Sequence, residues 1–281
     1  MIIYKHKQDI QKQIIALKKE GKTIGFVPTM GALHEGHLSL IEASRNATDI
    51  TVCSIFVNPT QFNDPKDFDK YPVTIETDIL KLSDAGADIL FMPSVSEMYP
   101  DGTGVLKHYN LGQLETILEG EYRPGHFQGV CNVVHRLFTI VNPDQAFFGQ
   151  KDYQQCMVIQ KLVELENLPV NIIIYPTIRE DSGLAMSSRN MLLSSEEKDE
   201  AIAIYRSLIF IKENKELLSI NDLQKEASQK LIDAGFQKID YVSICDAKTL
   251  QPVSKITDDI KAVALVAAYL SGVRLIDNML L

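Results

Sequence analysis

The sequence has no apolar run long enough to cross a bilayer and no excess of basic residues. A membrane-spanning helix needs about 20 consecutive apolar residues, so we expect no membrane insertion. The N-terminal segment 1–13 turns polar too early for a signal peptide, which favours a cytoplasmic protein. The formal net charge of −9 argues against a general affinity for nucleic acid. An anionic small molecule remains possible, because a local cluster of positive groups suffices to bind one.

Cysteine is scarce as well. The four cysteines are far apart, and each lies in a mainly apolar stretch: Cys53, Cys131, Cys156 and Cys245. No C-x-x-C pair occurs, so the sequence indicates neither a zinc knuckle nor a redox pair. We therefore predict buried, reduced thiols.

The composition is that of an ordinary globular protein, with 45% apolar and 23% charged residues. In the first part of the chain, apolar patterns of strand and helix type alternate. The strand-like runs are 22–29, 49–59, 88–93, 145–148 and 170–176, and the helix-like runs are 9–22, 38–48, 73–87, 127–141 and 153–167. Such alternation predicts an α/β fold, with a Rossmann-like parallel sheet covered by helices on both faces.

The pattern changes after about residue 178. Two helix-like runs, 194–218 and 221–235, precede three strand-like runs, 239–246, 260–270 and 273–278. Ser194 and Glu197 have the spacing of a capping box at the start of the first helix. We therefore predict two domains, residues 1–178 and a smaller α+β domain of residues 179–281.

The segment "PTMGALHEGHLSL", residues 28–40, joins a predicted strand to a predicted helix. Free backbone N–H groups and the helix dipole favour an anion at such a turn, and glycine allows a close backbone approach. His34 and His37 would add N–H donors to phosphate oxygens. A metal site is less persuasive, because no third ligand has a matching spacing. The alternative is that the histidines only fill a loop and cap a helix.

The segment "VNPTQFNDPKD", residues 57–67, follows the next predicted strand. Asn58 and Gln61 stand just past its carboxyl end, where open α/β sheets bind ligands. An amide such as Gln61 can donate and accept, which suits a substrate with hydroxyl, carboxylate or amine groups. The alternative is a simple turn that Asn58 supports.

The segment "FFGQKDYQQ", residues 147–155, again follows a strand. Lys151 offers a positive charge for phosphate, and Asp152 would serve as a helix cap or as a ribose or metal contact. Gln154 and Gln155 open the following helix. A solvated lysine beside a capping aspartate is the alternative.

The segment "GLAMSSRN", residues 183–190, lies between the two predicted domains. Its consecutive donors Ser187, Ser188 and Arg189 suit a polyphosphate, and domain interfaces are preferred ligand sites. The alternative is a polar linker with an N-capping serine. A further loop, with Arg123, His126 and Gln128, either covers a site or only enters a helix. His135 lies in an apolar helical pattern, which favours a structural role.

Together these segments resemble the pantothenate synthetase (pantoate–β-alanine ligase) family of the nucleotidyltransferase superfamily. "FVPTMGALHEGHLSL" is similar to the superfamily's H-x-G-H signature, and "GLAMSSRN" occupies the place of the K-M-S-K-S loop of class I aminoacyl-tRNA synthetases. "SIFVNPTQF", "RPGHFQGV" and "FFGQKDYQQ" follow in the family's order, so that the resemblance covers the whole chain. One departure is Gln150, where many members have glutamate.

The resemblance implies an ATP-dependent condensation of (R)-pantoate with β-alanine through a pantoyl adenylate, which yields pantothenate, AMP and pyrophosphate. It also implies Mg²⁺ with ATP, a homodimer, and a small domain that closes over the ATP site. The first step needs no general base, because pantoate is already a carboxylate; it needs alignment and charge stabilisation. Two alternatives stay open: a nucleotidyltransferase acting on phosphorylated pantetheine or a nicotinamide precursor, and a non-catalytic nucleotide-binding protein.

The resemblance also implies roles for individual residues. The implied ATP site consists of Met30, Gly31, Ala32, Leu33, His34, Glu35, Gly36, His37, Gly149, Gln150, Lys151, Asp152, Ile178, Met186, Ser187, Ser188 and Arg189. Gln61 and Gln155 would hold pantoate, with Gln61 also near β-alanine. The implied catalytic residues are His37, His34, Lys151, Ser187, Ser188 and Arg189. The resemblance and the sequence leave the metal ligands unassigned.

Overall fold

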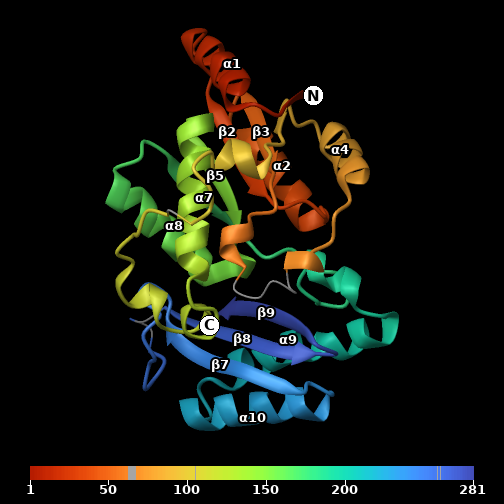
Figure 1. Cartoon of the computed structure of the whole chain (residues 1–281). Coiled ribbons are helices and arrows are strands. Elements are labelled where there is room, and N and C mark those ends of the chain that lie inside the picture. The colour runs from red at the N-terminus through yellow and green to blue at the C-terminus, as the bar shows by residue number, and fades with distance from the viewer. Residues whose placement is uncertain (63–67, 105, 258, 260) are drawn as a thin grey trace. The chain divides into compact units, whose positions relative to one another are not determined.

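The computed structural model describes residues 1–62, 68–104, 106–257, 259 and 261–281 (Figure 1). The rest of the predicted loop after Phe62, residues 63–67, and the first residue of the predicted strand 260–270 lie outside the described residues. The chain forms two compact units. The larger comprises residues 1–150 and 154–176, and the smaller comprises residues 151–153 and 177–281.

The larger unit contains a six-stranded parallel sheet with the strand order β1-β4-β3-β2-β5-β6. The strands are β1 (Ile2–Tyr4), β2 (Ile24–Thr29), β3 (Ile50–Ile55), β4 (Ile89–Phe91), β5 (Gln145–Gly149) and β6 (Asn171–Tyr175). The predicted parallel sheet is confirmed. The sequence pattern missed the edge strand β1, because three residues are too few to show a period.

The strand order places the predicted loops at one edge of this sheet. The chain moves from β2 outward to β3 and β4 on one side, whereas β5 and β6 extend the sheet on the other. The direction therefore reverses between β2 and β5. Ligands of open α/β sheets bind beyond the carboxyl ends of the strands at such a switch point.

Helices cover both faces of the sheet, as the sequence predicts (Figure 1). One face packs on α1 (Lys7–Lys19), α7 (His126–Val141) and α8 (Tyr153–Glu166), and the other on α2 (Glu35–Ala47) and α4 (Ile75–Asp84). Neighbouring strand residues such as Phe26 and Val27 belong to opposite clusters because side chains alternate across a strand. The shorter elements are α5 (Val95–Met98), α6 (Glu119–Tyr122), η1 (Pro59–Gln61), η2 (Gly112–Glu115) and η3 (Gln150–Asp152).

The smaller unit has its own hydrophobic core. It contains η4 (Ser188–Leu192), α9 (Ser195–Asn214), α10 (Ile220–Asp233), β7 (Lys238–Asp246), β8 (Ala262–Leu270) and β9 (Val273–Leu280). The three strands form an antiparallel sheet in the order β7-β8-β9. The capping box of Ser194 and Glu197 at the start of α9 is confirmed. The predicted fold class, a parallel sheet followed by a smaller α+β part, is therefore confirmed.

Two further sequence-based expectations concern burial. All four cysteines are buried, as predicted. Among the helices that the structure describes, none combines the length and apolar character needed to cross a membrane.

Candidate active site

The loop that follows β2 is held by its own backbone N–H groups. The Asp78 carboxylate on α4 accepts the N–H of Ala32 and that of Leu33, each at 2.8 Å, and the Thr29 hydroxyl accepts the N–H of Gly31 at 3.2 Å. The sequence pattern predicted free backbone N–H groups for an anion at this turn. The structure instead turns all three towards acceptors within the protein, so backbone donors to an anion must come from the first turn of α2.

The conformation of the loop explains its glycine. Gly31 and Ala32 both have positive φ, 83° and 50°, a region in which glycine carries no steric penalty. A Cβ atom at Gly31 would lie 3.1 Å from the Asp78 carboxylate. A side chain here would therefore press on the group that holds the next two residues.

Asp78 and Lys81 form an anchor that the sequence analysis missed. Asp78 is fully buried, and Lys81 on the same helix donates to the Leu33 carbonyl at 2.6 Å. A signal was present, because Asp78 shares the helical face of Leu82 and so stands as an acidic residue within an apolar stripe. A buried carboxylate needs strong hydrogen-bond donors, and the loop provides them.

His34 and His37 shape the start of α2. His34 is the N-cap residue and His37 the third residue of the helix, and their side chains form a reciprocal capping box. The Nδ1 atom of His37 accepts the His34 N–H at 3.4 Å, and the two ring centroids lie 4.0 Å apart. The alternative in which the histidines cap a helix is thus realised.

Capping does not exclude a second role for these histidines. Since Nδ1 of His37 accepts a hydrogen bond, a neutral ring carries its proton on Nε2, where it suits a donor to a phosphate oxygen. The N–H groups of Glu35 and Gly36 have no acceptor within the helix, because they belong to its first turn. Together with the helix dipole, these donors favour an anion at the start of α2.

Gln61 lies beside Met30, so residues of two separate sequence clusters meet in the larger unit. The side chain of Gln61 is buried, and its Nε2 atom is 2.9 Å from the Met30 sulfur. Its Oε1 atom accepts from Asn58 at 3.2 Å, and its backbone carbonyl lies 2.7 Å from Nδ1 of His126. The amide is therefore held next to the loop after β2.

Asn58 supports the turn that carries Gln61. Its amide donates to the Gly129 carbonyl, and its carbonyl oxygen accepts from Thr60 and from the Tyr99 hydroxyl at 2.8 Å. A Cβ atom at Gly129 would lie 2.2 Å from the Thr60 carbonyl, which explains the glycine. The alternative role of Asn58, support of a turn, is thus the one observed.

The two glutamines at the start of α8 differ. The amide of Gln154 is buried and bonds to the backbone of Leu114, Ile117 and Glu119, so it fixes a neighbouring segment. Gln155 is half-buried, and among the described residues no hydrogen bond holds its amide. Gln155 is thus the one of the pair that remains suited to a ligand.

Lys151 and Asp152 belong to the smaller unit. The Lys151 ammonium is 3.6 Å from the Asp152 carboxylate, and the Lys151 carbonyl accepts from the Asn278 amide at 2.8 Å. Asn278 lies on β9 and is buried. The backbone of Lys151 is thus fixed within this unit.

The segment that contains Ile178 and Met186–Arg189 folds back on itself in the smaller unit. The Ile178 carbonyl accepts the Met186 N–H at 3.0 Å, next to a bridge between Arg179 and Ala185. Ser187 caps η4 by accepting the Arg189 N–H at 3.3 Å. The structure therefore brings these predicted residues together, and it also realises the capping alternative for Ser187.

Arg179 anchors this segment to β9. Its guanidinium donates to both oxygens of Asp277, at 2.5 and 3.0 Å, and to the Asn278 carbonyl at 3.3 Å. It also lies over the Tyr205 ring, 4.6 Å from the centroid. Burial raises the pKa of the Asp277 carboxyl, and the Arg179 charge acts in the opposite direction. The sequence pattern does not predict this pair.

Neighbouring residues of β9 thus hold two predicted segments of the smaller unit. Asp277 holds the segment 178–189, and Asn278 holds Lys151. No group of three or more histidine, cysteine, aspartate or glutamate side chains suited to a metal is found in the part of the chain that the structure describes. The geometry therefore assigns no protein ligands to a resident metal.

Comparisons with known proteins agree on one family. Residues 2–280 match the model of the pantoate-beta-alanine ligase family. The chain is 45% identical to pantothenate synthetase of Cytophaga hutchinsonii, over 98% of this chain and 97% of the relative. Against the crystal structure of pantothenate synthetase from Thermus thermophilus the TM-score is 0.91, with 40% identity and 99% of each chain covered.

A second solved structure carries ligands. Pantoate-beta-alanine ligase from Francisella tularensis, complexed with beta-gamma ATP and beta-alanine, has a TM-score of 0.85 and 38% identity to this chain. The similarity covers 100% of this chain and 97% of that one.

Proposed function

Because this chain belongs to the pantoate–β-alanine ligase family, we propose that the residues described above carry the two steps of that family's reaction. The enzyme condenses (R)-pantoate with β-alanine at the expense of ATP, and pantothenate, AMP and pyrophosphate are the products. The family match over nearly the whole chain excludes the alternatives, a different nucleotidyltransferase and a non-catalytic protein.

The start of α2 holds phosphates of ATP in the first step. The pantoate carboxylate attacks the α-phosphorus, and negative charge increases on the departing pyrophosphate. That step requires alignment and charge stabilisation, not a general base. The N–H groups of Glu35 and Gly36, the helix dipole and the rings of His34 and His37 supply such stabilisation. Met30, Gly31, Ala32 and Leu33 complete this part of the ATP site.

Most of the remaining ATP residues in this proposal belong to the smaller unit, whereas Gly149 and Gln150 belong to the larger one. Lys151, Ser188 and Arg189 serve as donors to the phosphates, with Ser187 beside them. Gly149, Gln150 and Asp152 complete the phosphate side, and Ile178 and Met186 provide backbone contacts to adenine. In this proposal the smaller domain, residues 179–281, closes over the ATP bound by residues 1–178.

Gln61 and Gln155 hold the acyl substrate. The Gln61 amide lies beside Met30, so a substrate bound to it lies next to the ATP loop. In the second step the β-alanine amine attacks the acyl carbon of the adenylate and AMP leaves. The amine proton passes to solvent or to the leaving phosphate, because no side chain of the described site is an evident base.

Mg²⁺, the oligomeric state and the compartment belong to the same proposal. The described residues contain no metal-binding group of three side chains, so we assign Mg²⁺ to the phosphates of ATP and to no residue. There it would neutralise phosphate charge. We also propose a homodimer and a cytoplasmic location.

The observation that carries the site assignment is the contact of 2.9 Å between Gln61 and Met30, which joins the predicted acyl and nucleotide segments. The activity is tested by measuring AMP release with pantoate and ATP, with and without β-alanine. Release that depends on both acids supports the proposal. Steady release with either acid alone would contradict it.

The variant Gln61→Ala tests the assignment of the acyl site. We expect the KM for pantoate to rise about tenfold or more, because a buried amide that bonds to substrate is lost, while the KM for ATP changes little. Gln160→Ala is the matched control, since Gln160 is an exposed glutamine on α8. A change confined to the KM for ATP would show that Gln61 belongs to the nucleotide site instead.

A further inference from the structure

A cavity opens in the larger unit, between α1, α5, the segment 107–109 and α7. Its volume is about 410 Å³. It is lined by Lys7, Gln11, Glu97, Met98, Lys107, Tyr109, Asn132, His135, Arg136, Thr139 and Ile140. The proposed reaction uses none of these residues.

This cavity lies well away from Gln61. His126, whose ring contacts the Gln61 backbone, begins α7, whereas His135 and Arg136 lie nine and ten residues further along the same helix. At 1.5 Å per residue this separation is about 14 Å. The cavity is therefore a separate feature. It is linked to the candidate active site through α7 and through Tyr99, whose ring lies under Arg136 and whose hydroxyl bonds to Asn58.

The cavity wall has more cationic side chains than carboxylates that pair with them. Glu97 accepts the backbone N–H of Lys7 at 2.9 Å, and Lys107 pairs with Glu166 at 2.6 Å. Arg136 donates to the Met98 carbonyl at 3.1 Å and lies over the Tyr99 ring. Within the described part of the chain, no carboxylate lies at ion-pair distance from the Lys7 ammonium or from Arg136. In a chain with a net charge of −9, this is a local site of positive charge.

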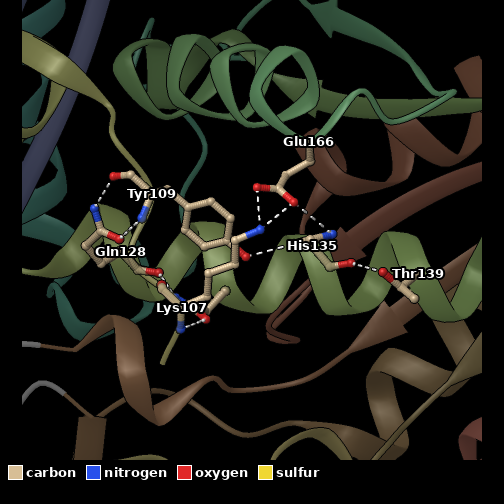
Figure 2. Close-up of polar contacts among 7 residues, drawn as sticks. Lys107, Tyr109, Gln128, His135, Thr139 and Glu166 are labelled. Carbon is tan, nitrogen blue, oxygen red and sulfur yellow. Dashed lines mark hydrogen bonds and ion pairs between the residues drawn. The ribbon is translucent and has the colours of Figure 1, made fainter. Parts of the chain in front are cut away.

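Figure 2 shows how the polar side of the cavity is ordered. The Tyr109 hydroxyl lies 2.8 Å from Nδ1 of His135, and Nε2 of His135 lies 3.8 Å from Glu166. Burial lowers the pKa of His135; Glu166 raises it, whereas Lys107 and Arg136 lower it further. The histidine is therefore neutral at pH 7. Lys107 is paired with Glu166, and Glu97 in the same wall carries a negative charge, so the positive charge available to a ligand is that of Lys7 and Arg136.

Part of the cavity wall is apolar. Met98 and Ile140 are buried, and the ring of Tyr109 is buried as well. Pockets with a few charged groups and an apolar wall bind small organic molecules that carry one polar end. A bare inorganic ion would leave this apolar wall unused.

We propose that this cavity binds a small organic anion, whose carboxylate or phosphate group lies on Arg136 and Lys7 and whose apolar part packs on Met98 and Ile140. Guanidinium groups bind both kinds of oxyanion through paired N–H donors. The proposed reaction does not use this site, so the two proposals are tested separately.

Isothermal titration calorimetry on the full chain, with ATP and pantoate saturating, tests the site. The probes are benzoate, phenyl phosphate, the neutral isostere benzamide and inorganic phosphate. We expect benzoate or phenyl phosphate to bind with a Kd of about 1 mM or tighter, and benzamide and inorganic phosphate to bind at least about tenfold more weakly. Binding of benzoate alone or of phenyl phosphate alone identifies the preferred head group.

Two variants place the binding in the cavity. Arg136→Gln and Lys7→Gln should each weaken binding about tenfold or more, because a charge-assisted bond is lost. Lys12→Gln, an exposed lysine on the same helix as Lys7, should leave it unchanged. Thermal unfolding identifies any variant that fails to fold. If Arg136→Gln fails to fold, the effect of Lys7→Gln on anion binding decides whether the anion binds in the cavity.

Three results would overturn the proposal. The first is no binding of either aromatic anion. The second is binding that survives both variants, and the third is equal binding of inorganic phosphate and phenyl phosphate. Light scattering completes the test: if the variants change only the oligomeric mass and leave anion binding intact, the cavity wall is a contact between copies of the chain instead.

Discussion

The loop 30–37 of the larger unit and the segment 178–189 of the smaller unit are both assigned to ATP, yet they are held in different ways. The first is held through its main chain, by a buried carboxylate that accepts two successive N–H groups. The second is held through one side chain, by the pair of Arg179 and Asp277, and by a backbone bridge.

This difference has a physical consequence. Two bonds to successive peptide groups fix the path of the backbone, so the positions of His34 and His37 follow directly from Asp78. A guanidinium at the end of a flexible side chain fixes its own end more than the backbone that bears it. We therefore expect the loop 30–37 to be the more rigid of the two, and substitutions in its anchor to cost more.

The largest effect should come from the loop 30–37 itself. His37→Ala should lower pantoate-dependent AMP formation about 10²-fold or more, the effect expected on removal of a donor to developing charge. Its cap bond to His34 is long, 3.4 Å, so the loss of stability should stay near about 1 kcal/mol. The measurements are steady-state kinetics and urea unfolding.

His108→Ala is the matched control for that variant, because His108 is exposed and outside the assigned site. It should keep the activity of the parent enzyme. A His37→Ala enzyme that retained near-normal adenylation would leave the histidine with its capping role alone.

Asp78→Ala should have the next largest effect. It leaves the N–H groups of Ala32 and Leu33 without their acceptor, at a cost of about 3 kcal/mol in the free energy of unfolding. Activity should fall about 10- to 100-fold, since the loop loses its fixed path. Urea unfolding and kcat/KM for ATP, measured where the variant is folded, report the two effects.

Asp78→Asn sharpens this prediction. An asparagine keeps the shape of the side chain but offers one acceptor oxygen, so its losses should lie between those of the parent and of Asp78→Ala. Equal stability and activity in all three proteins would show that the main-chain anchor is unimportant.

The anchor of the smaller unit should be weaker. Arg179→Lys keeps the charge but loses the paired bonds to Asp277, which should cost about 1–2 kcal/mol and raise the KM for ATP less than about tenfold. A double-mutant cycle with Asp277→Asn measures the coupling. If Arg179→Lys cost more than Asp78→Ala, the proposed order of the two anchors would be reversed.

Much of the fold could be predicted from the sequence, because the spacing of apolar residues indicates whether a segment forms a strand or a helix and which face is buried. Strands as apolar as β2 and β3, and helices as long as α7 and α9, were predicted with bounds close to the observed ones. Elements of three or four residues, such as β1, α5 and α6, were missed. They are too short for a period to repeat clearly, and tertiary contacts decide them.

The residues of the candidate site likewise fall into two groups, those in local motifs and those that depend on contacts between distant segments. The residues proposed to contact a ligand, such as His34, His37, Gln61 and Ser187, lie in local motifs, so the sequence alone is enough to propose them. The anchors could not, because Asp78 is 46 residues from Ala32 and Asp277 is 98 residues from Arg179. Only the fold brings such pairs together, although an acidic residue in the apolar stripe of α4 was a usable signal.

The smallest effect should come from a substitution that destabilises the smaller unit without touching its anchor. Ser194→Ala removes the N-cap of α9, which directly follows η4, and should cost about 1 kcal/mol in the free energy of unfolding. The segment 178–189 keeps its bonds to Asp277, so the KM for ATP should stay within about twofold of the parent value. Urea unfolding and ATP kinetics measure the two. If Ser194→Ala instead raised the KM for ATP as much as Arg179→Lys, the effect of the arginine would reflect general loss of stability, and the contrast between the two anchors would disappear.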